Sequence, residues 1–169
     1  MHEAVKDFIK EIKVKYPSAF INNNVIEFGS YDINGSTREF FKDCKYIGVD
    51  WRDGPGVDIV LLANNFKSYE KFNVVISTEM LEHDKYAEES VKNMVRLLAP
   101  NGLLIITCAG TLRKEHEQEC GIDNHYANIK PFELESWIDK KLFKEFKIEV
   151  SGKDIQLYAI KRWKLKKIL

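Results

Sequence analysis

Apolar residues along this chain gather in five short runs that are separated by polar or helical stretches. Each run spans four to six residues. A continuous apolar run of that length is typical of a strand buried on both faces, as in a parallel sheet. The five predicted strands are VIEF (25–28), YIGVD (46–50), VDIVLL (57–62), FNVVIS (72–77) and LLIITC (103–108).

Two other segments carry an apolar stripe at helical spacing, and 131–143 predicts a third helix. Pro17 follows the expected end of the first helix, and the sequence PNG (100–102) ends the second. Near the end of the chain, polar residues 151–154 separate two apolar halves and predict a hairpin. The two stripes are Val5, Phe8, Ile9 and Ile12, and then Ala87, Val91, Met94, Val95 and Leu98.

Strands that alternate with helices predict an α/β fold, and the right-handed crossover rule leaves few topologies for it. The simplest is a doubly wound, mostly parallel sheet of seven strands that closes with an antiparallel hairpin. No repeat, linker or low-complexity tract interrupts the pattern. Residues 1–169 are therefore predicted to form a single domain.

Composition and charge narrow the function classes. Hydrophobic residues make up 44% and charged residues 31%, an ordinary globular balance. The 26 basic and 26 acidic side chains cancel, so overall charge gives no support for a nucleic-acid or membrane partner. The basic end KRWKLKKIL (161–169) is interpreted as a solvated segment, with a nucleic-acid or lipid contact as the alternative.

Cysteine usage and hydropathy indicate the cellular compartment. Cys44, Cys108 and Cys120 are odd in number and have no paired spacing, which favours a reducing compartment. The start of the chain lacks the apolar core of a signal peptide, and no apolar run approaches the ~20 residues that a bilayer span needs. We therefore expect a cytoplasmic protein with no membrane span.

A small polar turn follows the first predicted strand in VIEFGSYDINGS (25–36). Gly29 would let the backbone approach a ligand, since it has no Cβ. Asp50 ends the second predicted strand 21 residues later, the spacing of an acid that accepts hydrogen bonds from ribose hydroxyls. Together they predict a site for an adenosine-type ligand. The alternative is a purely structural pair of turns, at 29–35 and 50–56.

The residues of this turn are unlike a dinucleotide fingerprint. Tyr31 stands where the second glycine of G-x-G-x-x-G would be, and the turn offers no cation for a diphosphate. Glu27 and Asp32 make it negative instead. That charge suits a cationic or zwitterionic ligand, such as the sulfonium compound S-adenosylmethionine.

Over most of its length the chain resembles the class I S-adenosylmethionine-dependent methyltransferases, which have a Rossmann-like fold. Four stretches carry the resemblance in the family's order and spacing: 25–38, 46–60, 72–84 and 97–110. The resemblance implies that the methionine end of S-adenosyl-L-methionine meets the turn after the first strand. It also implies that Asp50 holds the ribose. The other implied cofactor contacts are Glu27, Gly29, Ser30, Tyr31, Trp51, Leu62, Ala63, Asn64, Ser77, Thr78 and Glu79.

Two positions depart from the family pattern. Tyr31 replaces a common glycine, so its phenol must turn away from the cofactor or cover it. Leu62 stands where many relatives carry an acid that accepts from the adenine amino group. Backbone near Ala63 and an asparagine side chain would then hold the adenine.

Candidate catalytic residues follow the fourth and fifth predicted strands. His83 could take a proton at neutral pH, or it could brace its loop. His125 and Tyr126 lie in a polar stretch that covers the acceptor site in the resembling family, and they could orient an acceptor or stabilise the loop. His116, Cys120 and His125 have no established zinc spacing, so no metal is predicted.

The acceptor class is narrowed by motifs that this sequence lacks. Residues 77–80 read Ser-Thr-Glu-Met where amino-directed DNA methyltransferases carry Asn/Asp-Pro-Pro-aromatic, and no Pro-Cys pair is present. A small molecule, a glycan precursor or a protein side chain remains possible, and the oligomeric state stays open. One rival is a non-catalytic cofactor-binding module or partner subunit. The other is a nicotinamide oxidoreductase using Tyr126 and Lys130, which Pro131 disfavours because it follows Lys130 directly.

Overall fold

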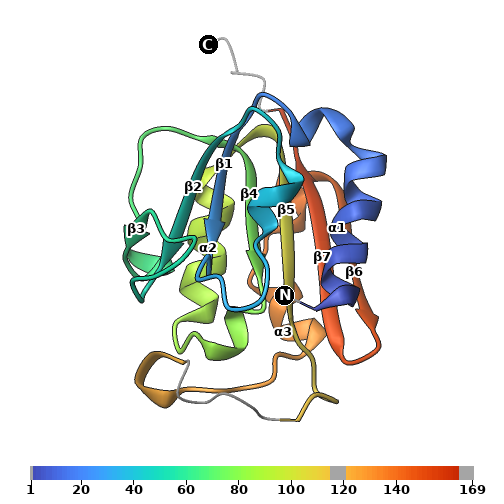
Figure 1. The fold of residues 1–169 in the computed structure, drawn as a ribbon. Helices are drawn as coiled ribbons and strands as arrows, with labels where there is room; N and C mark the ends of the chain where they lie inside the picture. Colours follow the sequence, from blue (N-terminus) through green and yellow to red (C-terminus); the bar gives the residue numbers. More distant parts are fainter. Residues whose placement is uncertain (1, 115–120, 164–169) are drawn as a thin grey trace.

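The computed structural model describes residues 2–114 and 121–163. Within them the chain forms a seven-stranded sheet in the order β3-β2-β1-β4-β5-β7-β6 (Figure 1). The first five strands in the sequence are parallel, and β7 is antiparallel to both β5 and β6. The predicted fold class is confirmed. The strands are β1 (Asn24–Phe28), β2 (Lys45–Asp50), β3 (Ile59–Val60), β4 (Phe72–Thr78), β5 (Leu98–Ala109), β6 (Phe143–Ser151) and β7 (Asp154–Lys161).

Strand order reverses at β1, which pairs with β2 on one side and with β4 on the other. Phe28, the last residue of β1, pairs in register with Val49 and with Ser77. The carboxyl ends of three parallel strands therefore meet at one edge of the sheet. Ligands of open α/β sheets bind at such a switch point.

Helices cover both faces of the sheet. Helix α1 (Glu3–Lys15) buries its predicted stripe against one face, beside Val74 and Ile76. Helix α2 (Ala87–Leu97) packs on the opposite face, beside Val75, because successive side chains of a strand point to opposite sides. Helix α3 (Pro131–Ser136) contributes the buried Leu134 to that second layer.

The predicted strand 57–62 differs from expectation. Only Ile59 and Val60 form β3, and their exposed fractions are 37% and 53%. The expected burial on both faces is wrong here because β3 is an edge strand. Among the described residues, the connections from β1 to β2 and from β2 to β3 contain turns and the short 3-10 helix Thr37–Phe40 but no α-helix, and both residues of β3 are left exposed.

Two boundaries also differ from the pattern. Strand β5 begins at Leu98, directly after α2, so this residue belongs to the sheet and not to the helical stripe. The third predicted helix ends at Ser136, and Phe143 already starts β6. The hairpin was predicted correctly, and Gly152 supplies its positive φ of 63°.

Two further expectations can be compared with the described residues. Cys44 and Cys108 are free thiols, while Cys120 lies outside the described ranges. None of the helices described is both long and apolar enough to cross a membrane.

Candidate functional site

A cleft of about 290 Å³ opens at the edge of the sheet where β1, β2 and β4 end. Its walls are the turn after β1 (29–36), the end of β2 (50–52), the segment 61–63 and the residues after β4 (78–80). Most of the residues predicted to touch a cofactor therefore lie around one cavity. The shared edge explains this, since parallel strands deliver all their carboxyl ends to the same side.

The turns after β1 and β2 are joined through Asp50. Its Oδ2 accepts a hydrogen bond from the backbone N–H of Tyr31 at 3.3 Å, and its Oδ1 accepts one from the N–H of Arg52 at 3.0 Å. Burial raises the pKa of this carboxyl, which is 8% exposed. A carboxylate has about four acceptor positions, so Asp50, which lines the cleft, keeps acceptor capacity beyond these two bonds.

Gly29 lines the cleft, and the structure shows why a residue with a side chain does not fit at this position. Its φ is 81°, a conformation that residues with a side chain rarely adopt. A Cβ on Gly29 would lie 2.6 Å from Cβ of Met80. The glycine is thus required by its backbone conformation and by Met80, and the backbone approach of a ligand to Gly29 stays a prediction.

Glu27 is buried at the inner end of the cleft. Its carboxylate accepts hydrogen bonds from Thr37 Oγ1 at 2.8 Å and from the Tyr46 hydroxyl at 2.7 Å. Burial raises the pKa of Glu27 to about 7, although these two hydroxyl donors lower it. A cation bound beside Glu27 would favour the ionised form.

Tyr31 packs along the side of the cleft. A Cβ on Gly54 would lie 2.1 Å from its ring, so the phenol rests directly on the Gly54 backbone. The guanidinium of Arg52 lies 4.5 Å from the Tyr31 ring centroid and 5.5 Å from that of Trp51. The contacts with Gly54 and Arg52 hold the Tyr31 side chain in place as part of the cleft lining.

The remaining predicted cofactor residues divide into two groups. Leu62, Ala63, Thr78 and Glu79 line the cleft. Asn64 and Ser77 are not among its lining residues, and Ser77 is fully buried in the sheet. Contact of Ser77 with a cofactor stays a prediction.

The three candidate catalytic residues are not brought together at the cleft. His83 lines it and lies edge-on to Tyr126, with ring centroids 5.1 Å apart. Tyr126 itself is not among the lining residues that the structure describes. His125 borders a separate groove beside α2 and α3. His116, Glu117 and Cys120 of the same polar stretch lie outside the described residues.

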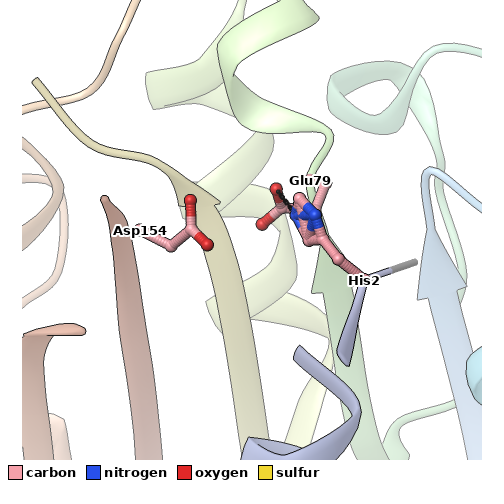
Figure 2. Close-up of side chains that lie close together, drawn as sticks. All are labelled: His2, Glu79 and Asp154. Atoms are coloured by element: carbon pink, nitrogen blue, oxygen red, sulfur yellow. Dashed lines mark hydrogen bonds and ion pairs between the residues drawn. The ribbon is translucent and has the colours of Figure 1, made fainter. Parts of the chain in front are cut away.

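A group of polar residues whose proximity the sequence did not reveal lies where the cleft reaches the ends of β4 and β5. Figure 2 shows three of its members, His2, Glu79 and Asp154, and the fourth is Arg113. Glu79 Oε2 lies 2.8 Å from His2 Nε2 and 2.8 Å from Arg113 Nη1. Arg113 Nη1 also donates to Asp154 Oδ1 at 2.5 Å. These residues come from positions 2, 79, 113 and 154, so no local pattern could have predicted the group.

Ligand atoms of His2, Glu79 and Asp154 lie within 4.8 Å of one another, a spacing that a divalent ion could bridge. Arg113 Nη1 occupies the space between the two carboxylates, at hydrogen-bonding distance from both. Its guanidinium therefore supplies the positive charge that a metal would bring. Burial raises the pKa of Glu79, Asp154 raises it further, and Arg113 lowers it.

Beneath this end of the cleft lies a second buried acid, Glu82. It is fully buried, and neither carboxyl oxygen has a hydrogen-bonding partner among the residues described. Burial raises the pKa of Glu82 to about 8, with Glu79 adding to the rise, while the nearby backbone of Glu82 and Ala109 offsets it in part. Burial therefore favours the protonated form of Glu82.

The comparisons with known proteins agree with this geometry. The family model described as a methyltransferase domain matches residues 1–143. A search of curated proteins gave no match.

Solved structures of similar fold include three methyltransferases. The Burkholderia thailandensis 1,6-didemethyltoxoflavin-N1-methyltransferase, with bound S-adenosylhomocysteine, has a TM-score of 0.65 and 12% identity over 92% of this chain and 78% of its own. The N-methyltransferase NodS of Bradyrhizobium japonicum, also with S-adenosylhomocysteine, has a TM-score of 0.62 and 14% identity over 92% of this chain and 86% of its own. The Haemonchus contortus phosphoethanolamine N-methyltransferase 2, in complex with S-adenosyl-L-methionine, has a TM-score of 0.69 and 15% identity over 94% of this chain and 53% of its own.

At these identities the structural likeness shows a shared fold. The family model, in contrast, covers most of the chain and includes every wall of the cleft. The chain therefore belongs to the family of methyltransferase domains.

Proposed function

We propose that this chain transfers the methyl group of S-adenosylmethionine to a small molecule, a glycan precursor or another acceptor that is not a nucleic acid. The observation that carries the proposal is Asp50, a buried carboxylate at the end of β2 that lines the cleft and is hydrogen-bonded to the turn after β1. Its remaining acceptor capacity suits the two hydroxyls of a ribose. Similar folds crystallised with S-adenosylmethionine or S-adenosylhomocysteine support this choice of ligand.

The cleft offers a place for each part of that ligand. With the ribose on Asp50, the adenine would lie between Trp51 and the segment 62–63. The methionine end would then extend along Gly29 and Ser30 towards Glu27, whose carboxylate would receive the amino group. The sulfonium methyl would point to the far end of the cleft, beyond Thr78.

Charge in the cleft favours a cationic ligand over a diphosphate. Five acidic side chains line it against two arginines, and the guanidinium of Arg113 is engaged by Glu79 and Asp154. A pyrophosphate would meet carboxylates where it requires cations or free N–H groups. A nicotinamide dinucleotide contains such a pyrophosphate, so the charge of the cleft argues against this ligand too. The five acids are Glu27, Asp32, Asp50, Glu79 and Asp84.

The chemistry that this arrangement supports is mainly one of positioning. The methyl of a sulfonium ion is already activated, so the protein has to hold donor and acceptor in line. Such positioning can contribute up to about 7–11 kcal/mol of the rate enhancement in favourable cases. The joined turns at Asp50 would fix the donor, and the polar group at the far end of the cleft would fix the acceptor.

Calorimetry with S-adenosylhomocysteine tests the proposal. We expect binding to the wild-type protein and affinity at least about tenfold weaker for Asp50→Ala, since the ribose loses a charged acceptor. Asp53→Ala is the matched control, because Asp53 is an exposed acid three residues further on that does not line the cleft. No binding to the wild-type protein would reject the proposal. Binding without methyl transfer to any of a panel of amines and alcohols would favour the non-catalytic module.

A further inference from the structure

Three oxygen-bearing side chains form a closed triangle of short contacts beside the cleft. Glu27 belongs to β1, Thr37 begins the 3-10 helix Thr37–Phe40, and Tyr46 belongs to β2. Thr37 Oγ1 lies 2.8 Å from Glu27 Oε1, and the Tyr46 hydroxyl oxygen lies 2.7 Å from Glu27 Oε2. The two hydroxyl oxygens are 2.6 Å apart. All three distances are those of O–H···O hydrogen bonds. We call these three side chains the Glu27 triangle.

The number of hydrogens in the Glu27 triangle depends on the charge of its carboxyl. Each hydroxyl has a single hydrogen, and an ionised carboxylate can only accept. If Glu27 is ionised, both hydrogens point to it, and the 2.6 Å contact between Thr37 and Tyr46 is left without a donor. A third hydrogen, on the carboxyl, gives each of the three contacts its own. The three distances together therefore match a neutral Glu27.

The charged groups around the triangle do not supply a cation in place of that hydrogen. Asp32, in the turn after β1, raises the pKa of Glu27, and Arg38, in the 3-10 helix, lowers it. The Arg38 guanidinium is paired with Asp58 and lies 4.7 Å from the centroid of the Tyr46 ring. Helix α1 packs on the same face of the sheet through its apolar stripe. The cation that acts most strongly on Glu27 is therefore already neutralised by another acid.

One member of the triangle is accessible to a ligand. Glu27 lines the cleft, whereas Thr37 and Tyr46 are not among the lining residues that the structure describes. An ammonium group that reaches Glu27 from the cleft would bring both N–H donors and a positive charge. Each of these favours the ionised carboxylate over the neutral acid.

We propose that the Glu27 triangle holds a proton in the free protein and releases it when the ammonium of the methyl donor binds, an inference that rests on the proposed function. The O–H bond of the Glu27 carboxyl breaks, its electron pair stays on oxygen, and the proton passes to solvent. The ammonium keeps its own protons and becomes the donor to the carboxylate. Thr37 and Tyr46 act through Glu27, as positioning residues that keep its carboxyl at the cleft.

The selectivity of the cleft should then depend on pH. Burial raises the pKa of Glu27 to about 7, so the ionised fraction grows about tenfold between pH 6 and pH 8. Because the carboxyl must lose its proton to receive the ammonium, affinity for a ligand with an ammonium rises with pH over this interval, by up to about tenfold. A ligand without an ammonium leaves Glu27 neutral and shows no such rise.

Calorimetry with two unreactive ligands tests the proposal. S-adenosylhomocysteine carries the amino acid end, whereas 5′-methylthioadenosine has the same nucleoside and a thioether without it. At pH 6, wild type should release about one proton more on binding S-adenosylhomocysteine than on binding 5′-methylthioadenosine. The proton is measured from the heats in two buffers that differ in ionisation enthalpy. The preference for S-adenosylhomocysteine should rise up to about tenfold from pH 6 to pH 8.

Two variants identify the source of the proton. Glu27→Gln cannot ionise, so the two ligands should release equal numbers of protons and the preference should not vary with pH. Glu39→Gln changes an exposed acid two residues after Thr37 that does not line the cleft, and it should behave as wild type.

Each outcome of these measurements has a distinct meaning. Equal proton release for the two ligands in wild type, or a difference that persists in Glu27→Gln, would overturn the role of the Glu27 triangle. The wild-type comparison decides the matter even if Glu27→Gln does not fold. Binding of S-adenosylhomocysteine to wild type at pH 6 without proton release would reject this inference alone. If wild type bound neither ligand, the proposed function itself would fail.

Discussion

Replacement of the buried acid Glu82 by glutamine should stabilise the protein above neutral pH and have little effect near pH 4.5. The substitution keeps the shape of the side chain and removes its ability to ionise. In the folded protein the pKa of Glu82 is raised to about 8, because burial penalises the charged form. In the unfolded chain it returns to the ordinary value of 4.5.

The size of the effect follows from that difference. A raised folded-state pKa contributes stability that is fully present below pH 4.5 and is lost as pH rises towards 8. At 1.36 kcal/mol per pH unit, this interval corresponds to roughly 5 kcal/mol, an upper bound for a fully buried group. Other buried carboxyls are present in both proteins, so their titration largely cancels in the comparison. Since domains are stable by only about 5–15 kcal/mol, the gain in Glu82→Gln should be easy to measure.

Urea unfolding at pH 5 and pH 8 provides the assay. The free energy of unfolding of Glu82→Gln should exceed that of wild type by several kcal/mol more at pH 8 than at pH 5. Glu88→Gln is a matched control, because Glu88 is half exposed on α2 and should change stability by less than about 0.5 kcal/mol at either pH. A difference between Glu82→Gln and wild type that is the same at both pH values would refute the reasoning.

Three further substitutions test other parts of the structure. Gly29→Ala should cost at least about 2 kcal/mol in urea unfolding, since the residue has a positive φ and its Cβ would overlap Met80; an unaffected protein would contradict this reason. Tyr46→Phe removes a hydrogen-bond donor to Glu27. The loss of unfolding free energy should be about 1–3 kcal/mol larger at pH 8.5, where Glu27 is ionised, than at pH 5, where it is neutral. Equal losses at the two pH values would argue against this hydrogen bond. Val60→Thr should change the free energy of unfolding by less than about 0.5 kcal/mol, because this residue is 53% exposed. A larger loss would indicate that another segment packs on β3.

The sequence predicted the parts of the fold that depend on local pattern. The apolar stripe of α1 and the strand runs around Val25, Val74 and Leu104 were recognised because their periodicity reports their burial directly. The strand 57–62 was overestimated, because an apolar run does not show whether another element covers it. Ile59 and Val60 are exposed since, within residues 2–114 and 121–163, no α-helix lies in the connections from β1 to β2 and from β2 to β3.

The candidate site was predictable only for residues at the ends of strands whose place in the sheet follows from the sequence. Gly29 and Asp50 were expected at one cleft because both follow strands that meet at the switch point, and both line it. His2 gave no signal, since its contact with Glu79 spans 77 positions and depends on how α1 packs. The interpretation of Gly29 also required coordinates, because Met80 approaches it from a different strand end.

The carboxylate of Asp50 connects the amide of Tyr31 to the amide of Arg52, and it is also the group that we assign to the ribose. Binding of the ribose and ordering of the two turns are therefore thermodynamically coupled through Asp50. Occupancy of the nucleoside end should slow hydrogen–deuterium exchange at both amides together, by the same factor, even though the two belong to separate crossovers of the sheet.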